Sequence, residues 1–392
     1  MGSEMKTNST GQLTNGSSSV APFDGMENTR ALPRHTREHN RSLVVRVLYH
    51  HGPMSRAEIA RATGLAKVTI SDLIAQLMEA GYVEELGLQE VTGPGKPAIL
   101  VDLARKSQLV LAIDLSDYHV FRGALLDLDA EVVHRINLDR DGKSGEEAVG
   151  LLCSLIGQLV GEADRPILGI GIGTPGIVNT EGTVVLAQNL DWKDVPLQTL
   201  ISEQFNIPVV VDNDANLAAM GEHLHGEAPD DFVLITIGHG IGAGIMLGGS
   251  LVRGTNDSSG EVGLVMVGTE DGFDSPYNFD YTLEHWLSLR ALESHWDGKS
   301  AEEREQILRN AGKLLGVNLA TLVAALDLSE IVIAGPPEVA NETLVSVTAE
   351  VIRRRTLPGN YSDLVVRTSS RSEDVVFLGC SALVLSKFLG VS

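Results

Sequence analysis

The residues that could do chemistry gather in a few short motifs. Asp214, in the run Asp-Asn-Asp-Ala-Asn at 212–216, offers a carboxylate that can accept a charge-assisted hydrogen bond from a hydroxyl and take its proton. Glycine-rich runs stand at 172–176 and 238–244, where glycine permits a tight turn of the backbone. These motifs favour a small-molecule site.

Sulfur and metal chemistry are not expected. Cys153 and Cys380 are the only cysteines, which is too few for a disulfide framework, and they lack the paired spacing of a zinc ribbon or redox motif. We expect both to be buried apolar side chains.

The elements that must position these residues fall into segments of different charge. The 392 residues carry a formal net charge of −22, which argues against general binding of polyanions. Residues 30–106, however, hold 11 basic against 8 acidic side chains, whereas residues 107–392 hold 18 against 41. Only the front segment could approach DNA, and the acidic body suits a small or neutral ligand.

The N-terminal residues do not have the composition of a folded segment. Residues 1–36 are rich in Ser, Thr, Asn and Gly, so we expect a disordered leader. No apolar stretch reaches the roughly 20 residues of a membrane span, and the first thirty residues lack an apolar signal core. We therefore expect a cytoplasmic protein without membrane contact.

A winged helix-turn-helix is predicted over residues 37–106. Helical periodicity and a Ser-Arg-Ala-Glu capping box at 55–58 predict three helices, the third over about 66–79. Two β-like runs at 82–86 and 98–103 complete a wing. The residues expected to be buried in the third helix are Val68, Leu73, Ile74 and Leu77.

In such a module the third helix enters the major groove and the wing lies along the phosphates or the minor groove. The residues expected to contact DNA are Lys67, Thr69, Ser71 and, in the wing, Lys96. Ala66 stands where a capping side chain is usual, which costs the helix about 1 kcal/mol. The alternative is a structural appendage that never touches DNA.

Beyond residue 106, short apolar strands alternate with helical stretches, the pattern of an α/β body. A first strand pair, a later glycine-rich turn and a late strand that ends in glycine suggest two lobes and a central cleft. The strands are expected at 109–115, 123–127, 167–172, 209–211, 232–237 and 331–334.

Several motifs in order resemble those of the ROK family (repressors, open reading frames, kinases). They are Ile-Gly-Thr-Pro-Gly at 172–176, Asp-Asn-Asp-Ala-Asn at 212–216, Gly-His-Gly-Ile-Gly-Ala-Gly at 238–244 and Gly-Glu-Val-Gly at 260–263. The resemblance covers about residues 37–390 and includes the winged N-terminus of the family's repressor branch. It implies an actin-like, ribonuclease-H-like fold that binds a sugar between its lobes. We expect one lobe at 107–226, the second, with the ligand cleft and the oligomer contacts, at 227–372, and a C-terminal helix at 373–390 that returns to the first lobe.

The resemblance places Asp214 at the catalytic base of the family's kinases. Their first phosphate loop resembles Asp-x-Gly-Gly-Thr, whereas this chain has Asp-Leu-Ser-Asp-Tyr at 114–118. A carboxylate at Asp117 would repel phosphates, and Tyr118 fills space that a small residue leaves open. Gly-Pro-Pro at 335–337 removes amide donors from the turn that resembles the adenosine-binding segment. We therefore expect a vestigial base, no bound ATP and no enzymatic phosphoryl transfer.

The zinc motif of the family is also absent. Where the family has a histidine followed by a cysteine cluster, this chain has Leu264 and no cysteine within 275–284, so we expect no zinc. We expect aromatic packing to organise the segment instead, through Tyr277, Phe279, Tyr281 and Trp286.

A partial sugar site remains. The positions that match the family's contacts with the sugar are Gly176, Asn213, Asp214, Glu261 and Glu284. A plainer alternative is that Asn213 and Asp214 cap the following helix, that Glu261 is a solvated loop charge and that the pocket is vestigial.

The sequence thus predicts a transcriptional regulator, in the first place a repressor, that binds operator DNA and responds to a carbohydrate. We expect a homodimer or tetramer on a pseudo-palindromic operator, because one small module binds weakly at physiological salt and two tethered modules gain effective concentration. The helix over about 302–326 is a candidate for the dimer interface or a core helix. The alternatives are a sugar kinase, a bifunctional kinase and regulator, and a ligand-independent DNA-binding dimer.

Overall fold

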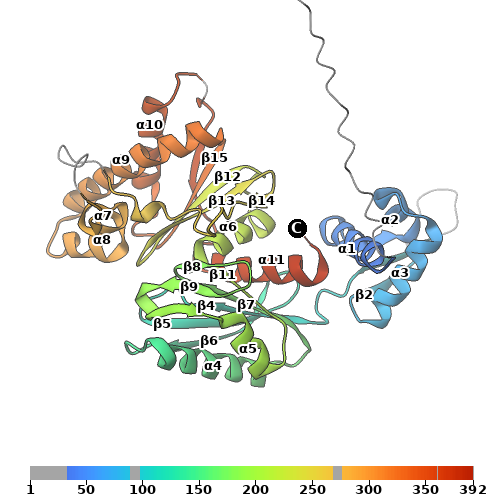
Figure 1. Ribbon diagram of the computed structural model, residues 1–392. Helices are drawn as coiled ribbons and strands as arrows, with labels where there is room; N and C mark the ends of the chain where they lie inside the picture. Colours follow the sequence, from blue (N-terminus) through green and yellow to red (C-terminus); the bar gives the residue numbers. More distant parts are fainter. Residues whose placement is uncertain (1–32, 89–97, 268–275, 360, 392) are drawn as a thin grey trace, which may run out of the picture.

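The computed structural model describes residues 33–88, 98–267, 276–359 and 361–391. A small N-terminal head lies beside a larger two-lobed body, and the C-terminal helix runs between the lobes towards the head (Figure 1). This is the expected α/β architecture, a winged helix-turn-helix followed by two lobes.

The head is built from three helices and an antiparallel sheet of order β1-β3-β2. The capping box at the start of the second helix is present, because the Ser55 side chain accepts from the amide of Glu58 and the Glu58 carboxylate accepts from the amide of Ser55. The elements are α1 (Pro33–His51), β1 (Met54–Ser55), α2 (Arg56–Thr63), α3 (Lys67–Glu79), β2 (Val83–Leu88) and β3 (Ile99–Leu103).

Two expectations for the head are wrong. The first helix begins at Pro33, inside the expected leader, and proline suits a first helical turn because its missing amide has no helical partner there. Val68 is 73% exposed, and Ile70 takes its place in the core. The buried stripe of α3 follows the helical period from Ile70 through Leu73 and Leu77, which turns Val68 to the opposite side.

The first lobe has a five-stranded sheet of order β11-β7-β4-β5-β6, in which β11, β7 and β4 are parallel. Its strands and outer helices are β4 (Leu109–Asp114), β5 (Val120–Leu126), β6 (Val132–Asp139), α4 (Gly145–Glu162), β7 (Ile167–Thr174), α5 (Leu197–Phe205) and β11 (Val209–Asn213). A small sheet of order β10-β9-β8 adds β8 (Ile177–Val178), β9 (Val184–Ala187) and β10 (Trp192–Val195), with η1 (Gln188–Leu190) between the last two.

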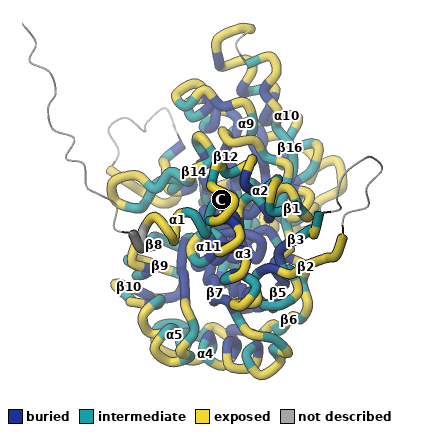
Figure 2. Tube along the Cα trace, turned by 90° about the vertical axis from the view of Figure 1, so that its right-hand side faces the viewer, coloured by how far each residue is buried: buried dark blue, intermediate teal, exposed yellow. Residues whose placement is uncertain are grey.

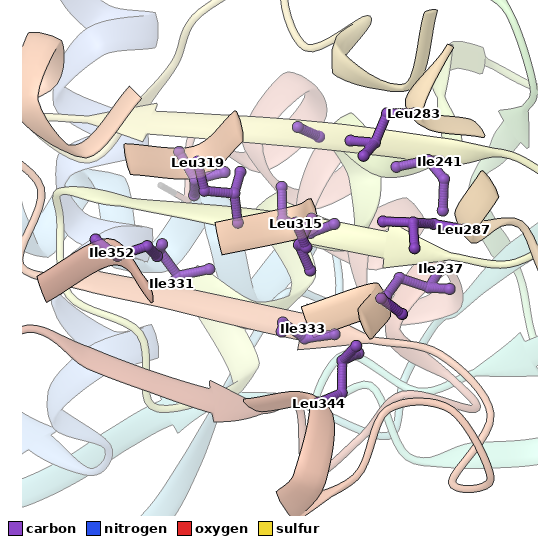
Figure 3. Close-up of a cluster of buried hydrophobic side chains, with 14 of the residues drawn as sticks. Ile237, Ile241, Leu283, Leu287, Leu315, Leu319, Ile331, Ile333, Leu344 and Ile352 are labelled. Atoms are coloured by element: carbon purple, nitrogen blue, oxygen red, sulfur yellow. The ribbon is translucent and has the colours of Figure 1, made fainter. Parts of the chain in front are cut away.

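The second lobe repeats this plan with the strand order β14-β13-β12-β15-β16. Its core lies between the sheet and the outer helices (Figure 3). The strands are β12 (Phe232–Ile237), β13 (Ile241–Leu247), β14 (Ser250–Leu251), β15 (Glu330–Ala334) and β16 (Val365–Thr368), and the helical elements are η2 (Val262–Leu264), η3 (Phe279–Tyr281), α7 (Leu283–Leu287), α8 (Leu289–Trp296), α9 (Ala301–Leu326) and α10 (Glu342–Arg355).

Two helices form the layer between the sheets. α6 (Asp214–His225) packs on β13 and β12 of the second lobe, α11 (Val375–Leu389) packs on β4 and β7 of the first, and the two helices pack on each other. The C-terminal helix therefore lies against the first lobe, where the sequence expects it. α9 buries one face against α10 and the core of the second lobe. Of the two alternatives for this segment, dimer interface or core helix, this packing agrees with the core helix.

The head packs directly on the body. Arg105, just after the last strand of the head, donates hydrogen bonds to the carbonyls of Leu48 and Tyr49 and pairs with Asp129 of the first lobe at 2.5 Å. Figure 2 shows α1 and α11 close together near the C-terminus. One apolar cluster joins α1, the first sheet and α11 through Val44, Leu48, Val110, Val384 and Leu389. The orientation of the head therefore depends on the body.

In the described part of the chain, no helix combines the length and the apolar character that a bilayer crossing needs.

Candidate functional site

The N-terminus of α6 carries the first site residues. The Asn213 side-chain oxygen caps α6 by accepting from the amides of Ala215 and Asn216 at 2.9 and 3.1 Å, and its nitrogen donates to the carbonyl of Gly176 at 2.9 Å. Asn213 therefore caps α6, as the plainer alternative predicts. Its side-chain nitrogen has a second proton that a ligand could accept. Its main effect is to fix α6 against the loop of Gly176.

The loop at Gly176 needs glycine. Its φ is +89°, and a Cβ there would overlap the carbonyl oxygen of Leu186. The absent side chain lets the loop lie close to β9 and brings the Gly176 carbonyl to Asn213.

Asp214 is the first residue of α6 and lies in an acidic environment. One carboxylate oxygen accepts from the amide of Ala215 at 2.8 Å. Burial, followed by repulsion from Asp114 and from Glu261, raises the pKa of Asp214 to about 7, although the Ala215 amide acts in the opposite direction. The carboxyl can therefore change its protonation state near neutral pH.

Asp114 is a site residue that the sequence indicates only as part of a phosphate loop. It is buried at the end of β4, and burial raises its pKa despite the Arg122 guanidinium at 3.4 Å and a hydrogen bond from Ser116. β4 and β11 flank β7 and run parallel to it, so their carboxyl ends lie at the same edge of the sheet, which explains the proximity of Asp114 to the Asp214 segment.

Glu261 and Glu284 complete the cluster from the second lobe. Glu284 accepts from the amide of Ile241 at 2.9 Å. Burial raises the pKa of both glutamates, and repulsion by Glu284 raises that of Glu261 further. Glu261 is thus not the solvated loop charge of the alternative. The structure brings the expected ligand residues of both lobes together.

A second link between the lobes was not predicted. Asp212 is fully buried at the end of β11 and forms an ion pair with Arg253 of the second lobe. Asp212 also accepts from the side-chain amide of Asn216 at 3.1 Å. Nothing in the sequence pairs these residues, because Arg253 lies in a loop far along the chain.

A carboxylate of the loop at 114–118 binds the backbone amides that follow the loop. The carboxylate of Asp117 accepts from the amides of His119 and Val120 at 2.7 and 3.1 Å, so these donors already have an anionic partner. The Arg140 guanidinium lies 4.9 Å from the centre of the Tyr118 ring. Asp117 therefore caps the backbone that leads into β5.

The turn that carries His239 in the second lobe contacts the 118–119 segment of the first lobe. The His239 ring lies 5.8 Å from the Tyr118 ring and 5.6 Å from the His119 ring. Aromatic contacts thus join the 114–118 loop of the first lobe to the glycine-rich motif of the second.

The retained glycines at 238–244 have a packing role. The turn covers only 238–240, because β13 starts at Ile241, so the long glycine-rich turn expected there is wrong. A Cβ at Gly242 would lie 2.8 Å from the Cβ of Ala215, and one at Gly244 would lie 2.5 Å from the Cβ of Ala219. These glycines allow α6 to approach the second sheet closely.

Aromatic packing does not organise the segment at 277–286, although the sequence predicts that it would. The four aromatic side chains expected to organise it are exposed, with exposed fractions of 64% for Tyr277, 45% for Phe279, 38% for Tyr281 and 45% for Trp286. Buried Leu283 and Leu287 of α7 anchor the segment, together with a backbone hydrogen bond from Val267 to the Tyr281 carbonyl at 2.7 Å. Short α7 can bury only one stripe, and leucines occupy it.

The prediction that both cysteines are buried is confirmed for one of them. Cys380 is buried in α11, and burial raises the pKa of its thiol strongly. Cys153 is only half-buried, so the expectation for it is wrong.

Two of the four residues expected to contact DNA lie on the outer surface of α3. Lys67 and Ser71 are exposed, and the Ser71 hydroxyl donates to the Lys67 carbonyl at 3.0 Å. Thr69 lines a groove between α3 and the start of α1. Lys96 lies outside the described residues. Ala66 is the N-cap and provides no side-chain hydrogen bond, as expected.

The far end of α6 touches the head. Its last residue, His225, lies with Nδ1 3.5 Å from the Tyr49 hydroxyl of α1. Burial lowers the pKa of His225 to about 4 and raises that of Tyr49 to about 12, so both are neutral at pH 7. The same helix therefore carries Asp214 at one end and contacts the head at the other.

Comparisons with known proteins place the chain in a family. Residues 110–387 match the model of the ROK family, and residues 38–88 match that of the MarR family. The xylose repressor of Caldicellulosiruptor bescii is 31% identical over 388 residues, which cover 89% of this chain and 96% of the repressor.

Solved structures share the fold. A ROK family transcriptional regulator described as a homologue of E. coli Mlc has a TM-score of 0.78 at 24% identity, covering 91% of this chain and 98% of the regulator. A ROK glucokinase from Streptomyces griseus, solved with glucose and AMPPNP, has a TM-score of 0.61 at 23% identity over 70% of this chain and 98% of the kinase. The family match covers more than half of the sequence, and the resemblance seen in the motifs is confirmed. This chain belongs to the ROK family and joins the family's sugar-kinase-like body to an N-terminal winged helix of the MarR type.

Proposed function

We propose that this chain is a transcriptional regulator, a repressor in the first instance, that binds operator DNA through its winged helix and responds to a carbohydrate in the acidic cleft. Relatives aligned along most of the chain are named as repressors, the xylose repressor of C. bescii among them. We place the protein in the cytoplasm, where an operator is accessible.

One observation carries the proposal: α6 joins the cleft to the head. Asp214 stands at its first residue and His225, against Tyr49, at its last. Gly379 of α11 lies so close to α6 that a Cβ would overlap the Leu217 carbonyl, so the two helices move as a unit. A ligand that draws the lobes together would shift this unit and, with it, the head.

The cleft favours a polyhydroxylated ligand. The carboxylates of Asp214, Glu261 and Glu284 repel one another when charged. Sugar hydroxyls can donate charge-assisted hydrogen bonds to such acceptors and so relieve part of the repulsion. D-Xylose is the first sugar to test, because of the named relatives.

We further propose that the body transfers no phosphoryl group and holds neither ATP nor zinc. The amides of His119 and Val120 are occupied by Asp117, and Tyr118 meets His239 where a triphosphate would lie. Among the described residues no cluster of His, Cys, Asp or Glu has a metal-binding arrangement, and Leu264 offers no ligand atom.

The test is a DNA-binding titration with the full-length chain. An operator is selected from a random duplex library, and its affinity is measured by fluorescence anisotropy with D-xylose, D-glucose and N-acetylglucosamine. We expect one sugar to change the affinity roughly 5- to 150-fold, the usual range of allosteric coupling, and Asp214→Leu to remove the change. The matched control is Asp139→Asn, an exposed aspartate on β6.

The outcomes are distinct. If no duplex is selected over random DNA, the proposed function fails. Operator binding that no sugar alters, together with the absence of a sugar-induced thermal shift, would leave a ligand-independent DNA-binding dimer instead. A true ligand at 100 times its dissociation constant should add about 2.7 kcal/mol of stability.

A sugar kinase is the second candidate, and one observation favours it. A pKa of about 7 suits Asp214 as a general base at neutral pH. A coupled assay of ADP release with magnesium ATP and the same sugars decides between them. We expect the wild-type protein to release no more ADP than Asp214→Asn does. Sugar-dependent ADP release by wild type that is lost in Asp214→Asn would establish a kinase.

The proposed assembly is a homodimer or tetramer on a pseudo-palindromic operator. Analytical ultracentrifugation with and without operator tests it. A purely monomeric chain on a single half-site would contradict the symmetry.

A further inference from the structure

The outer face of α3 carries an apolar side chain that its fold does not use. Val68 is 73% exposed, the largest exposed fraction among the bulky apolar residues of the described chain. Single exposed apolar residues are common on protein surfaces, so the position of Val68 decides its meaning. It is the second residue of the helix that faces DNA in a winged helix.

Val68 belongs to a ridge of small or apolar side chains. Ser71 and Ala75 follow it on the same side of the helix, at steps of three and four residues, and both are exposed. Thr69, Asp72 and Gln76 line the adjoining groove against α1, so the one acidic side chain of this part of α3 lies beside the ridge. The ridge therefore lies on the solvent-facing side of α3, opposite the buried stripe.

The surroundings favour nucleic acid as the partner of this ridge. Lys67 in α3 and Arg61 in the last turn of α2 are exposed cations. The N-cap residue Ala66 leaves the first amides of α3 without a side-chain acceptor, so a backbone phosphate can take that place. An apolar ridge between such groups fits the floor of a major groove flanked by phosphates.

The major groove offers one apolar group that identifies a base, the C5 methyl of thymine. We propose that Val68 determines specificity by packing against the methyl group of one thymine in each half-site. This inference rests on the proposed function, because it needs operator binding by the head. It goes beyond that function by assigning a base type to a named residue.

The test removes in turn the thymine methyl group and the Val68 side chain that we propose to contact it. Duplexes carrying the selected operator are made with deoxyuridine in place of thymidine at one position at a time, which deletes a single methyl group. Wild type should lose affinity about fourfold at one thymine per half-site, from about 0.8 kcal/mol per buried methyl-sized group. Val68→Ala should bind the unmodified operator about as weakly and should not respond to deoxyuridine at that position.

Two controls make the result specific. Val133→Ala removes an exposed valine from β6 of the body and should reproduce the wild-type profile. Val68→Ile keeps an apolar contact and should retain the sensitivity to deoxyuridine. Circular dichroism checks the fold, which the exposed position of Val68 should leave unchanged.

The failures can be told apart. If wild type selects no operator, the proposed function is wrong. If wild type selects an operator but its deoxyuridine profile is flat, or is the same in Val68→Ala, the inference about Val68 alone is overturned. Equal weakening of operator and random DNA by Val68→Ala would also overturn it, since a base contact must discriminate.

Discussion

Replacing Asp214 by asparagine should stabilise the protein at neutral and alkaline pH. In the folded state its carboxyl lies near Asp114 and Glu261 with its pKa raised from 3.8 to about 7. Between these values the folded state binds a proton that the unfolded state has released, so stability is lost as the pH rises. Asparagine keeps an acceptor oxygen for the Ala215 amide and removes the charge.

The magnitude follows from the two pKa values. The interval from 3.8 to about 7 corresponds to about 4 kcal/mol. The variant should exceed wild type in free energy of unfolding by about 2 kcal/mol at pH 5.5 and about 4 kcal/mol at pH 8. The gap should thus widen by about 2 kcal/mol between these pH values.

Urea unfolding followed by tryptophan fluorescence measures this gap. Trp192 is buried in the first lobe and reports the unfolding of the region that holds Asp214. Asp139→Asn, on the exposed face of β6, is the matched control and should show no such pH-dependent gap. A gap of equal size at pH 5.5 and 8, or a variant less stable than wild type at pH 8, would refute the account of the acidic cluster.

Other substitutions test the remaining elements. Gly244→Ala should cost about 1–3 kcal/mol in urea unfolding, because its Cβ would overlap the backbone of α6, whereas Gly161→Ala in the open face of α4 should cost nothing. Tyr49→Phe should leave operator affinity unchanged but reduce the sugar-induced change by up to about fivefold, through loss of its hydrogen bond to α6; an unchanged response in the anisotropy titration would exclude this path. Lys67→Ala should reduce the ratio of operator to random-DNA affinity in a competition assay, and an unaltered ratio would remove this residue from base recognition.

The sequence predicts the central strands well, since their side chains are buried on both faces. β4, β7 and β12 are continuous apolar runs, and each was expected within a few residues. β6 was missed because it alternates exposed and partly buried residues at the edge of its sheet, a weak signal for one strand. The sequence predicts a turn in place of β13 because glycines, which here serve helix packing, are also typical of turns.

For the site, local motifs identify residues but not their tasks. The sequence points to Asn213 and Asp214, yet only the structure shows that the first is mainly a helix cap and that the second faces Asp114. Long-range pairs such as Asp212 with Arg253 have no sequence signal at all. The exposure of Val68 was mistaken because valine alone suggests burial, while the helical register of its neighbours decides it.

The contacts around Asp117 and Tyr118 bear on how a body of this kind could act as a switch. A kinase must close around two ligands and reopen after each reaction. The relative position of its lobes therefore depends on nucleotide as well as on sugar. Here Asp117 already occupies the loop amides, and Tyr118 and His119 meet His239 across the cleft. A ligand shifts an equilibrium only through its different affinities for the two states. On the proposal that this body holds no nucleotide, a carbohydrate is the ligand that would bias the lobes, and the position of the head on α6 would then respond to a single signal.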